Sequence, residues 1–265
     1  EFPGDALVAN QTGGDLLIQI CADDPQAALH ALRTLEQATR GALVPRSVHR
    51  GQQRFTSENG EPKARGLLGF KDGTANINQA DTSTLDREVW LPTNVAGEPA
   101  WTQNGTYMVF RKIRERLEAW DRESLDSQQR LIGRQRSNGA PLDGKQESEP
   151  PDFKADPDGQ HTPLDSHIRR ANPRLPGKRQ EQILRRSYPY FDGHDQAGLI
   201  DAGLLFIAFQ RDPIAQFETI KQRLSPPGAR PQGLDEYLQP VGGGYFFVPH
   251  GATSQRDYIA SRLFA

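Results

Sequence analysis

Three polar side chains in separate segments are of the types that peroxide chemistry at a haem would require. Asp72 stands in a glycine-bounded turn at 69–74, His167 follows Asp-Ser, and Arg185 follows Ile-Leu. An imidazole can ligate haem iron from one side. On the other side, a carboxylate can move a proton between the peroxide oxygens, and a guanidinium can stabilise the charge that develops as the O–O bond breaks. Together these residue types indicate a haem site.

Four motifs carry a resemblance to the dye-decolourising haem peroxidases. They are Gly-x-x-Asp-Gly at 69–73, Asp-Ser-His-Ile-Arg-x-Ala-Asn-Pro-Arg at 165–174, Ile-Leu-Arg-Arg at 183–186 and Val-Gly-Gly-Gly-Tyr-Phe-Phe at 241–247. The resemblance extends over essentially all 265 residues and is greatest to the exported bacterial branch that includes the deferrochelatase/peroxidases. It implies haem b (iron protoporphyrin IX) as cofactor, hydrogen peroxide as oxidant, and bulky dye or phenol-like donors oxidised in one-electron steps.

The Asp72 turn has two interpretations. An Asp-Gly pair between apolar residues is most often a tight turn with no further role. The resemblance instead implies that Asp72 stands over the distal side of the haem and shuttles the peroxide proton. It also implies that Gly73, Thr74 and Ala75 bring the backbone close to the porphyrin edge, an approach to which glycine is suited.

The resemblance makes His167 the expected proximal iron ligand, although a lone histidine among polar neighbours is commonly a solvated surface residue. His161, six residues earlier, is the alternative ligand. Metal-bound histidines usually donate their other ring N–H to a carboxylate or carbonyl. Glu236 matches the family position for that acidic partner, and Asp235 is the neighbouring alternative.

Arginines are expected to complete the site. The resemblance implies that Arg185 is the distal arginine because it directly follows Ile-Leu, with Arg186 as the alternative. The segment Asn172, Pro173 and Arg174 matches a further haem-contacting stretch. A guanidinium suits the carboxylate of a haem propionate, which Arg174 is therefore expected to bind.

Composition limits the remaining function classes. Thirty-two basic and thirty-four acidic residues give a formal charge of −2, so nothing favours nucleic acid or an anionic membrane as partner. Cys21 is the only cysteine, which excludes an internal disulfide and a cysteine-cluster metal site. No apolar run reaches the roughly 18 to 20 residues of a membrane span. Residues 1–5 have no signal-peptide features, so the periplasmic or extracellular location is an expectation from the resemblance alone.

An internal repeat predicts the architecture. Residues 15–27 align with residues 203–215 at a constant offset of 188, and each copy is typical of a strand followed by a helix. Both predicted helices begin with Asp-Pro, where the aspartate can cap the helix and proline loses no hydrogen bond. Residues 107–110 and 245–248 predict further strands, and Ile113, Leu117 and Trp120 predict one face of a helix.

We therefore expect an α+β fold with duplicated ferredoxin-like domains, antiparallel sheets and flanking helices, of the dimeric α+β barrel type. Residues 1–64 would be the C-terminal part of an incomplete first domain, and residues 65–265 a second domain that carries most of the haem site. An N-terminal remainder of the same protein is expected as a partner, and a homo-oligomer is compatible with the sequence. The loop at 134–163, which leads into His167, is expected to form a wall of the haem pocket.

Two other functions fit the same residues. Relatives in the same branch are described as deferrochelatases, which would release iron from haem and leave the porphyrin intact. A non-catalytic haem-binding protein is the second alternative, but it would need only the His167 side of the site, so Asp72 and Arg185 favour an enzyme.

Overall fold

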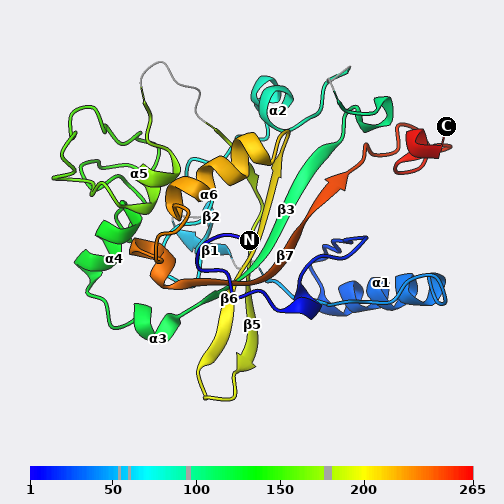
Figure 1. Ribbon diagram of the computed structural model, residues 1–265, viewed down its shortest axis with the longest axis horizontal. Helices are drawn as coiled ribbons and strands as arrows, with labels where there is room; N and C mark the ends of the chain where they lie inside the picture. The colour runs from blue at the N-terminus through cyan, green and yellow to red at the C-terminus, as the bar shows by residue number, and fades with distance from the viewer. Residues whose placement is uncertain (53–54, 59–60, 94–96, 176–180, 265) are drawn as a thin grey trace.

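The computed structural model describes residues 1–52, 55–58, 61–93, 97–175 and 181–264, and within them the fold is α+β with an antiparallel main sheet (Figure 1). The helices are α1 (Pro25–Ala38), α2 (Thr82–Glu88), α3 (Leu117–Trp120), α4 (Leu125–Ile132), α5 (His167–Ala171) and α6 (Thr219–Leu224), with a π-helical turn η3 (Ile214–Glu218) and the 3-10 turns η1 (Ala9–Gln11), η2 (Ala100–Thr102), η4 (Gly233–Glu236) and η5 (Ser261–Phe264). The strands are β1 (Phe55–Glu58), β2 (Glu61–Ala64), β3 (Thr106–Glu115), β4 (Leu184–Arg185), β5 (Tyr188–His194), β6 (Ile200–Gln210) and β7 (Leu238–Val248).

The main sheet is open, with the strand order β4-β6-β3-β7 and with β5 also paired to β6. The strands expected at 203–209, 107–110 and 245–248 lie within β6, β3 and β7, which confirms those three predictions and the antiparallel α+β class. Strands β1 and β2 form a separate antiparallel hairpin.

Glycines in β7 let the N-terminal segment lie along the edge of this strand. The amide of Val8 donates to the carbonyl of Val241, and the amide of Gly13 donates to that of Gly243, both at 2.8 Å. A Cβ at Gly242 would lie 2.4 Å from the carbonyl oxygen of Gln11, so no larger residue fits there. The segment thereby covers backbone groups that an exposed edge strand would leave unpaired.

The prediction of a strand before α1 was wrong. Residues 15–21 form no strand, and Leu16 and Ile18 are 60 % and 52 % exposed. A strand needs a partner for its backbone hydrogen bonds, and no described segment pairs with this one. The helix itself was predicted correctly, because Asp24 accepts a capping hydrogen bond from the amide of Gln26 at 2.9 Å.

The prediction of a helix that includes Ile113 was also only partly right. Ile113 belongs to β3 and pairs with Leu204 on one side and Pro240 on the other. Only Leu117–Trp120 form a helix. Pairing on both sides of a central strand outweighed the helical spacing of the apolar residues.

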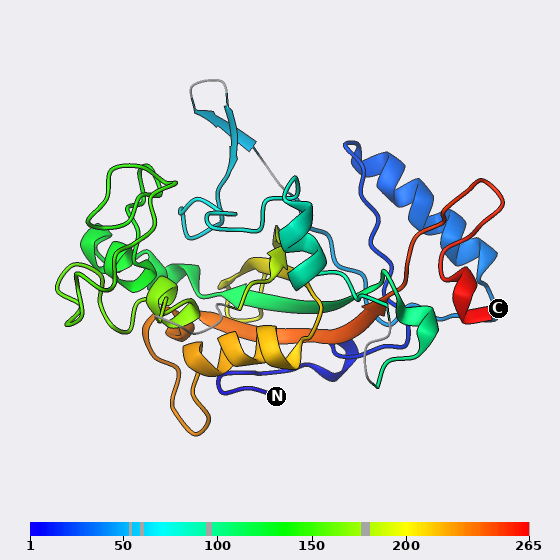
Figure 2. The same cartoon turned by 90° about the horizontal axis from the view of Figure 1, so that it is seen from above.

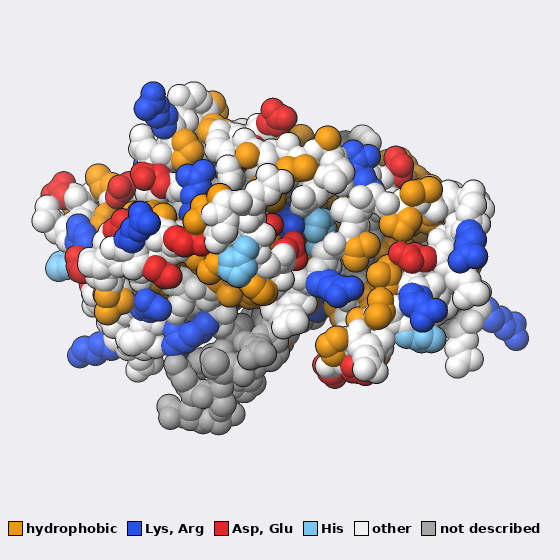
Figure 3. Space-filling view, turned by 90° about the horizontal axis from the view of Figure 1, so that it is seen from below, with side chains coloured by type: hydrophobic (Ala, Val, Ile, Leu, Met, Phe, Trp, Pro, Cys, Tyr) orange, Lys and Arg blue, Asp and Glu red, His pale blue; other side chains and the backbone are white. Residues whose placement is uncertain are grey.

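The elements surround the sheet unevenly. Figure 2 shows α6 against one face, with α2 and the β1–β2 hairpin on the other. Helices α3, α4 and α5 gather at one end, and α1 lies at the other end with the C-terminus. Acidic and basic side chains are interspersed over the face seen in Figure 3, in line with a formal charge of −2. No helix within the described ranges combines the length and apolarity that crossing a membrane requires.

Two apolar clusters anchor the segments that carry the candidate residues. Leu68 and Phe70, just before Asp72, pack with Trp120 and Leu234. In the other cluster, Leu184 packs with Ile77 and Val89 next to Arg185. The turn and the short strand β4 are thus each fixed by a buried neighbour.

Gly133 determines how closely α4 approaches α5. It ends α4 in the left-handed conformation with φ +92°, and a Cβ there would lie 2.5 Å from Cγ1 of Ile168, next to His167. Glycine therefore meets a conformational and a steric requirement at one position.

We expect Gly133→Ala to destabilise the fold by more than Gly198→Ala. Gly198 has a similar φ of +78° but nothing within 4 Å of the added Cβ, so it reports the backbone cost alone. That cost is about 1 to 2 kcal/mol, and the clash with Ile168 adds about 1 to 3 kcal/mol. Urea unfolding of both variants measures the difference, and equal losses would contradict the close packing of α4 on α5.

Candidate functional site

The Asp72 turn is tied down from two directions. Lys71 Nζ pairs with Glu147 Oε2 at 3.2 Å, and Thr74 Oγ1 donates to Glu147 Oε1 at 2.9 Å. From the other side, Arg185 Nη2 donates to the carbonyl of Thr74 at 2.9 Å. Glu147 belongs to the loop at 134–163, so this loop, the turn and β4 hold one another in place.

Arg185 is fixed through its backbone as well as its side chain. Its amide donates to Oδ1 of Asn76 at 3.0 Å, and Nδ2 of Asn76 donates to its carbonyl at 2.8 Å. Burial lowers the pKa of the Arg185 guanidinium, and the charge of Asp72 opposes that shift. The structure therefore brings Asp72 and Arg185 close enough to interact, whereas Arg186, the alternative, is exposed.

Near Asp72 lies a carboxyl group that sequence reasoning missed. Glu115, the last residue of β3, is 5 % exposed, and its Oε2 has no hydrogen-bond partner among the described residues. Burial, and then repulsion by Asp72, raises its pKa to about 7. In the sequence this glutamate stands between two arginines, a pattern typical of an exposed surface, so nothing there revealed its burial.

His167 is the first residue of α5, directly after the buried Ser166. Its Nδ1 is buried without a hydrogen-bond partner in the described part of the chain. Burial lowers its pKa to about 4, so the imidazole is neutral at pH 7 and keeps a lone pair for a ligand. His161, the alternative, is exposed.

Of the two acidic residues considered for His167, the structure favours Asp235 over Glu236. The charge of Asp235 is the one that raises the pKa of His167 against the effect of burial. The Asp235 side chain is 11 % exposed, its Oδ2 pairs with Lys221 Nζ at 3.0 Å, and it also accepts from the Ser225 hydroxyl. Glu236 is exposed, because the 3-10 turn η4 directs adjacent side chains to different sides.

Helix α5 is fastened to the loop at 134–163. Arg169 Nη1 lies 3.2 Å from Asp156 Oδ2, and its guanidinium is 4.8 Å from the ring centre of Phe153. Arg174, just beyond α5, lies 6.0 Å from the same ring. The loop therefore packs against the segment that contains His167, and its role as a wall of the haem pocket stays a prediction.

Three arginines form a positive cluster in the site. Burial lowers the pKa of Arg134, and the charges of Arg174 and Arg185 lower it further, while Glu147 opposes them. Burial also lowers the pKa of Arg174, whose Nε is buried and unpartnered within the described ranges. Such cations, crowded together and only partly neutralised, suit an anionic ligand. Sequence analysis missed Arg134, whose only signal was its place at the start of the loop.

The other predicted contacts lie in the same two segments. Gly73 and Ala75 adopt positive φ angles of +82° and +57° beside Thr74, and Gly73 donates its amide to Asp72 Oδ1 at 2.7 Å. Oδ1 of Asn172 accepts from the amide of Arg174 at 3.3 Å, and Pro173 lies between them.

Two family models match the chain. Residues 63–253 match the C-terminal model of the Dyp-type peroxidases, and residues 1–53 match the N-terminal model. The chain belongs to the Dyp-type peroxidase family. The motifs at 69–73, 165–174 and 183–186 all lie inside the C-terminal match.

Curated relatives and solved structures agree with this membership. The chain is 39 % identical over 264 residues to a deferrochelatase of Yersinia pestis and 40 % identical over 267 residues to one of Escherichia coli, with 99 % of the chain covered in each comparison. It spans only 59 % and 61 % of those relatives, about three fifths of their length.

The fold is similar to that of solved family members. A DyP-type peroxidase from Cellulomonas bogoriensis, known from its crystal structure, is 37 % identical in sequence to this chain, with a TM-score of 0.86. The match covers 99 % of this chain and 70 % of that protein. Ferric DtpA from Streptomyces lividans is 36 % identical with a TM-score of 0.87 and the same coverage.

We expect Glu115→Gln to become more stable relative to the unsubstituted protein as the pH rises from 5 to 8. With a folded-state pKa of about 7 instead of 4.5, Glu115 retains a proton that the unfolded chain releases. Its contribution to stability is therefore complete below pH 4.5 and is lost as the pH rises through 7. The relative gain should reach up to about 3 kcal/mol.

Urea unfolding at pH 5, 6.5 and 8, without added ligand, measures this change. Glu36→Gln, on the exposed surface of α1, is the matched control and should leave the pH profile parallel to that of the unsubstituted protein. A difference between Glu115→Gln and the unsubstituted protein that does not vary with pH would rule out the proposed ionisation of Glu115.

Proposed function

We propose that this chain holds haem b and belongs to a peroxidase that reduces hydrogen peroxide with electrons from bulky dye or phenol-like donors. The observation that supports the proposal is electrostatic contact between its two sides, because the charge of Arg185 lowers the pKa of His167. A neutral imidazole with an acidic neighbour lies at one segment, and the interacting pair Asp72 and Arg185 lies at another. The similar structure of DtpA from Streptomyces lividans is of a ferric protein, which supports the presence of iron in the family site.

The side chains present fit a haem. His167 has an unpartnered buried nitrogen, and Arg174 has one also, so both lack partners that a bound group would supply. Within the described ranges no group of three or more His, Cys, Asp or Glu could hold a metal ion. One imidazole is sufficient when a porphyrin supplies the other iron ligands. The positive charges of Arg134 and Arg174 suit the two propionates.

Each residue then has a distinct task. His167 would ligate the iron, with Asp235 nearby to strengthen the imidazole as a donor. Asp72 would take a proton from the peroxide oxygen that binds and deliver it to the oxygen that leaves as water. Arg185, held by Thr74, would stabilise the negative charge that develops on the departing oxygen. When bound, haem supplies the electrons that break the O–O bond and regains them from the donor in two one-electron steps.

Further parts of the proposal rest on the resemblance. Residues 1–64 would be the end of a first ferredoxin-like domain and 65–265 the second, and the remainder of the protein would complete the first. Periplasmic or extracellular export belongs to the same proposal, as does assembly into a homo-oligomer. The organic reductant would be too bulky to reach the iron directly.

We expect His167→Ala to lose the intense Soret absorption band after reconstitution with haem, because the axial ligand is removed. His161→Ala is the matched control, since this histidine is exposed on the neighbouring loop, and it should keep the band. Absorption spectra of the two purified variants decide the ligand. A full Soret band in His167→Ala, together with its loss in His161→Ala, would transfer the ligand role to His161.

We expect Asp72→Asn and Arg185→Ala to reduce the rate of reaction with peroxide by at least about 100-fold each. General acid–base catalysis contributes about 10² to 10⁴, and stabilisation of developing charge contributes a similar factor. Arg186→Ala is the control because its side chain is exposed next to Arg185 and should change little. Stopped-flow mixing with peroxide gives the rates, and unchanged rates would remove Asp72 and Arg185 from the mechanism.

Release of iron from haem is a second candidate function, favoured by the deferrochelatase names of the curated relatives. The two functions give different products. Anaerobic incubation with haem, without peroxide, followed by chromatography of the products distinguishes the two functions. Free protoporphyrin supports iron release, and its absence counts against it.

A further inference from the structure

Lys221, Ser225 and Asp235 form a hydrogen-bonded group next to the segment that carries His167. Lys221 Nζ pairs with Asp235 Oδ2 at 3.0 Å and donates to Ser225 Oγ at 2.7 Å. The Ser225 hydroxyl in turn donates to the same oxygen of Asp235. We call these three residues the Lys221 network. None of the roles proposed above uses Lys221 or Ser225.

The end of α6 places two members of the network on one side. Lys221 and Ser225 are four residues apart, so their side chains are neighbours on the helix surface, and the amide of Ser225 donates to the carbonyl of Lys221 at 2.8 Å. Ser225 is 4 % exposed, and the side chains of Lys221 and Asp235 are 14 % and 11 % exposed. Charges shielded from water in this way interact more strongly than charges on an open surface.

Two hydrogen bonds hold α6 against α5. Arg170 of α5 donates from Nη1 to the carbonyl of Leu224 at 3.3 Å, and Arg223 of α6 donates from Nη2 to the carbonyl of Ala171 at 3.0 Å. Each helix thus supplies a guanidinium to the last carbonyl of the other. The contact fixes the end of α6, and with it the Lys221 network, beside the helix that begins with the candidate iron ligand.

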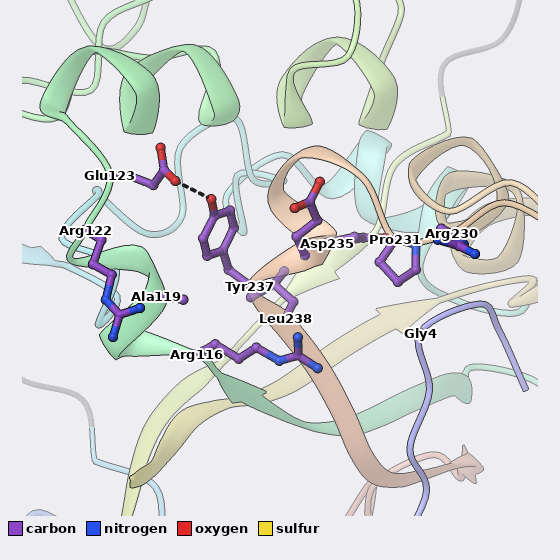
Figure 4. Close-up of a pocket in the computed structure, with 11 residues that line it drawn as sticks. Gly4, Arg116, Ala119, Arg122, Glu123, Arg230, Pro231, Asp235, Tyr237 and Leu238 are labelled. Carbon is purple, nitrogen blue, oxygen red and sulfur yellow. Dashed lines mark hydrogen bonds between the residues drawn. The ribbon is translucent and has the colours of Figure 1, made fainter.

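The turn η4 brings Asp235 to the same place. Gly233, the first residue of η4, has a φ of +62°, and a Cβ there would lie 3.4 Å from the carbonyl oxygen of Asp165, two residues before His167. On its other side, Asp235 lines a surface pocket of about 720 Å³, and Figure 4 shows it on η4 at the pocket wall. Water can reach a carboxylate from such a pocket, so the two donors of the network are what hold Asp235 in place.

The members of the ion pair act on His167 in opposite directions. Burial lowers the pKa of His167 most, and the charge of Asp235 raises it. The charges of Arg185 and then of Lys221 lower it further. The lysine that binds the acidic neighbour of the imidazole therefore also counteracts that neighbour at the imidazole.

This arrangement limits what the carboxylate can do for a metal-bound histidine. An acidic neighbour makes the imidazole a stronger donor by accepting its second ring N–H. The size of the effect depends on the charge that remains on the carboxylate. An ammonium and a hydroxyl that both bind Oδ2 of Asp235 neutralise part of that charge. Donation by the axial ligand is one of the factors that set the reduction potential of haem iron.

We propose that Lys221 and Ser225 are positioning residues that hold Asp235 beside His167 and limit the negative charge that it presents to the imidazole. They thereby restrain donation by the axial ligand. The iron is then a stronger oxidant toward organic donors than it would be beside an unpaired Asp235. The proposal rests on the proposed function, because it requires haem iron bound by His167.

The test compares the ferric/ferrous reduction potentials of haem-loaded Lys221→Met and Lys145→Met. Both substitutions remove a lysine charge, and Lys145 is an exposed control on the loop at 134–163. Lys221→Met should shift the potential to more negative values and raise the iron–imidazole stretching frequency in the resonance Raman spectrum of the ferrous protein. Lys145→Met should change neither. Lys221→Arg keeps the charge and should restore both values. An unchanged potential and stretching frequency in Lys221→Met would overturn the proposal.

A double substitution separates an effect through Asp235 from a direct effect of the lysine charge on the iron. Asp235→Asn removes the carboxylate charge, so the potential should become less negative. In that background, Lys221→Met should shift the potential far less than it does alone, because its partner is already gone. A shift of the same size in both backgrounds would show that Lys221 acts on the iron directly, and the proposal would be wrong.

Ser225→Ala tests the second donor. This substitution removes one hydrogen bond from Asp235 Oδ2 and keeps the ion pair with Lys221. The potential should shift in the same direction as in Lys221→Met, but by less. A potential equal to that of the unsubstituted protein would remove Ser225 from the proposal.

Failure of this proposal is distinguishable from failure of the proposed function. If the unsubstituted protein shows no Soret band, or if His167→Ala retains the band, haem is not bound as proposed and both proposals are wrong. If the band depends on His167 while Lys221→Met leaves the potential and the stretching frequency unchanged, only the role of the Lys221 network is overturned. The Soret band of each variant is recorded first for this reason.

Discussion

The hydrogen bond from Arg185 to the carbonyl of Thr74 is the interaction on which the candidate site depends. It joins a strand of the main sheet to the turn that carries Asp72, two segments more than a hundred residues apart. The same guanidinium interacts with the charge of Asp72 and repels that of Arg134. Strand β4 pairs with β6 in the main sheet, so this hydrogen bond ties the Asp72 turn to the sheet. The proton transfer proposed for Asp72 needs such a fixed position.

The charges buried in the candidate site are only partly balanced by one another. The charges of Arg174 and Arg185 both act unfavourably on Arg134, whereas Glu147 opposes them there and Asp72 acts favourably on Arg185. A buried charge without a partner costs several kcal/mol. An anionic ligand between the arginines would remove much of that cost, so the protein and its ligand are expected to stabilise each other.

The sequence could predict those parts of the fold and site that depend on local chemistry. The Asp-Pro start of α1, the apolar strands β3, β6 and β7, and the Asp72 turn all follow from residue type and spacing. Segments that depend on distant partners could not be predicted. Residues 15–21 have a strand pattern but no pairing neighbour, and Ile113 was assigned to a helix although β6 and β7 hold it in a strand.

The same distinction separates the predicted from the missed site residues. Asp72, His167 and Arg185 lie in recognisable motifs. Arg134 and Glu115 have ordinary sequence surroundings, and only the tertiary packing makes them buried charges. The choice between Asp235 and Glu236 could not be made from sequence, because a 3-10 turn sends neighbouring side chains to different sides.

The segment from Leu234 to Leu238 relates the core to two other interactions. Leu234 is buried in the cluster with Phe70 and Trp120, so its position is set by the core. With that anchor fixed, the charge of Asp235 acts on His167, and the Tyr237 hydroxyl donates to Glu123. The core residue therefore sets the relation between the surroundings of His167 and the Tyr237 hydrogen bond. A change in its packing would alter the environment of the imidazole and that hydrogen bond together.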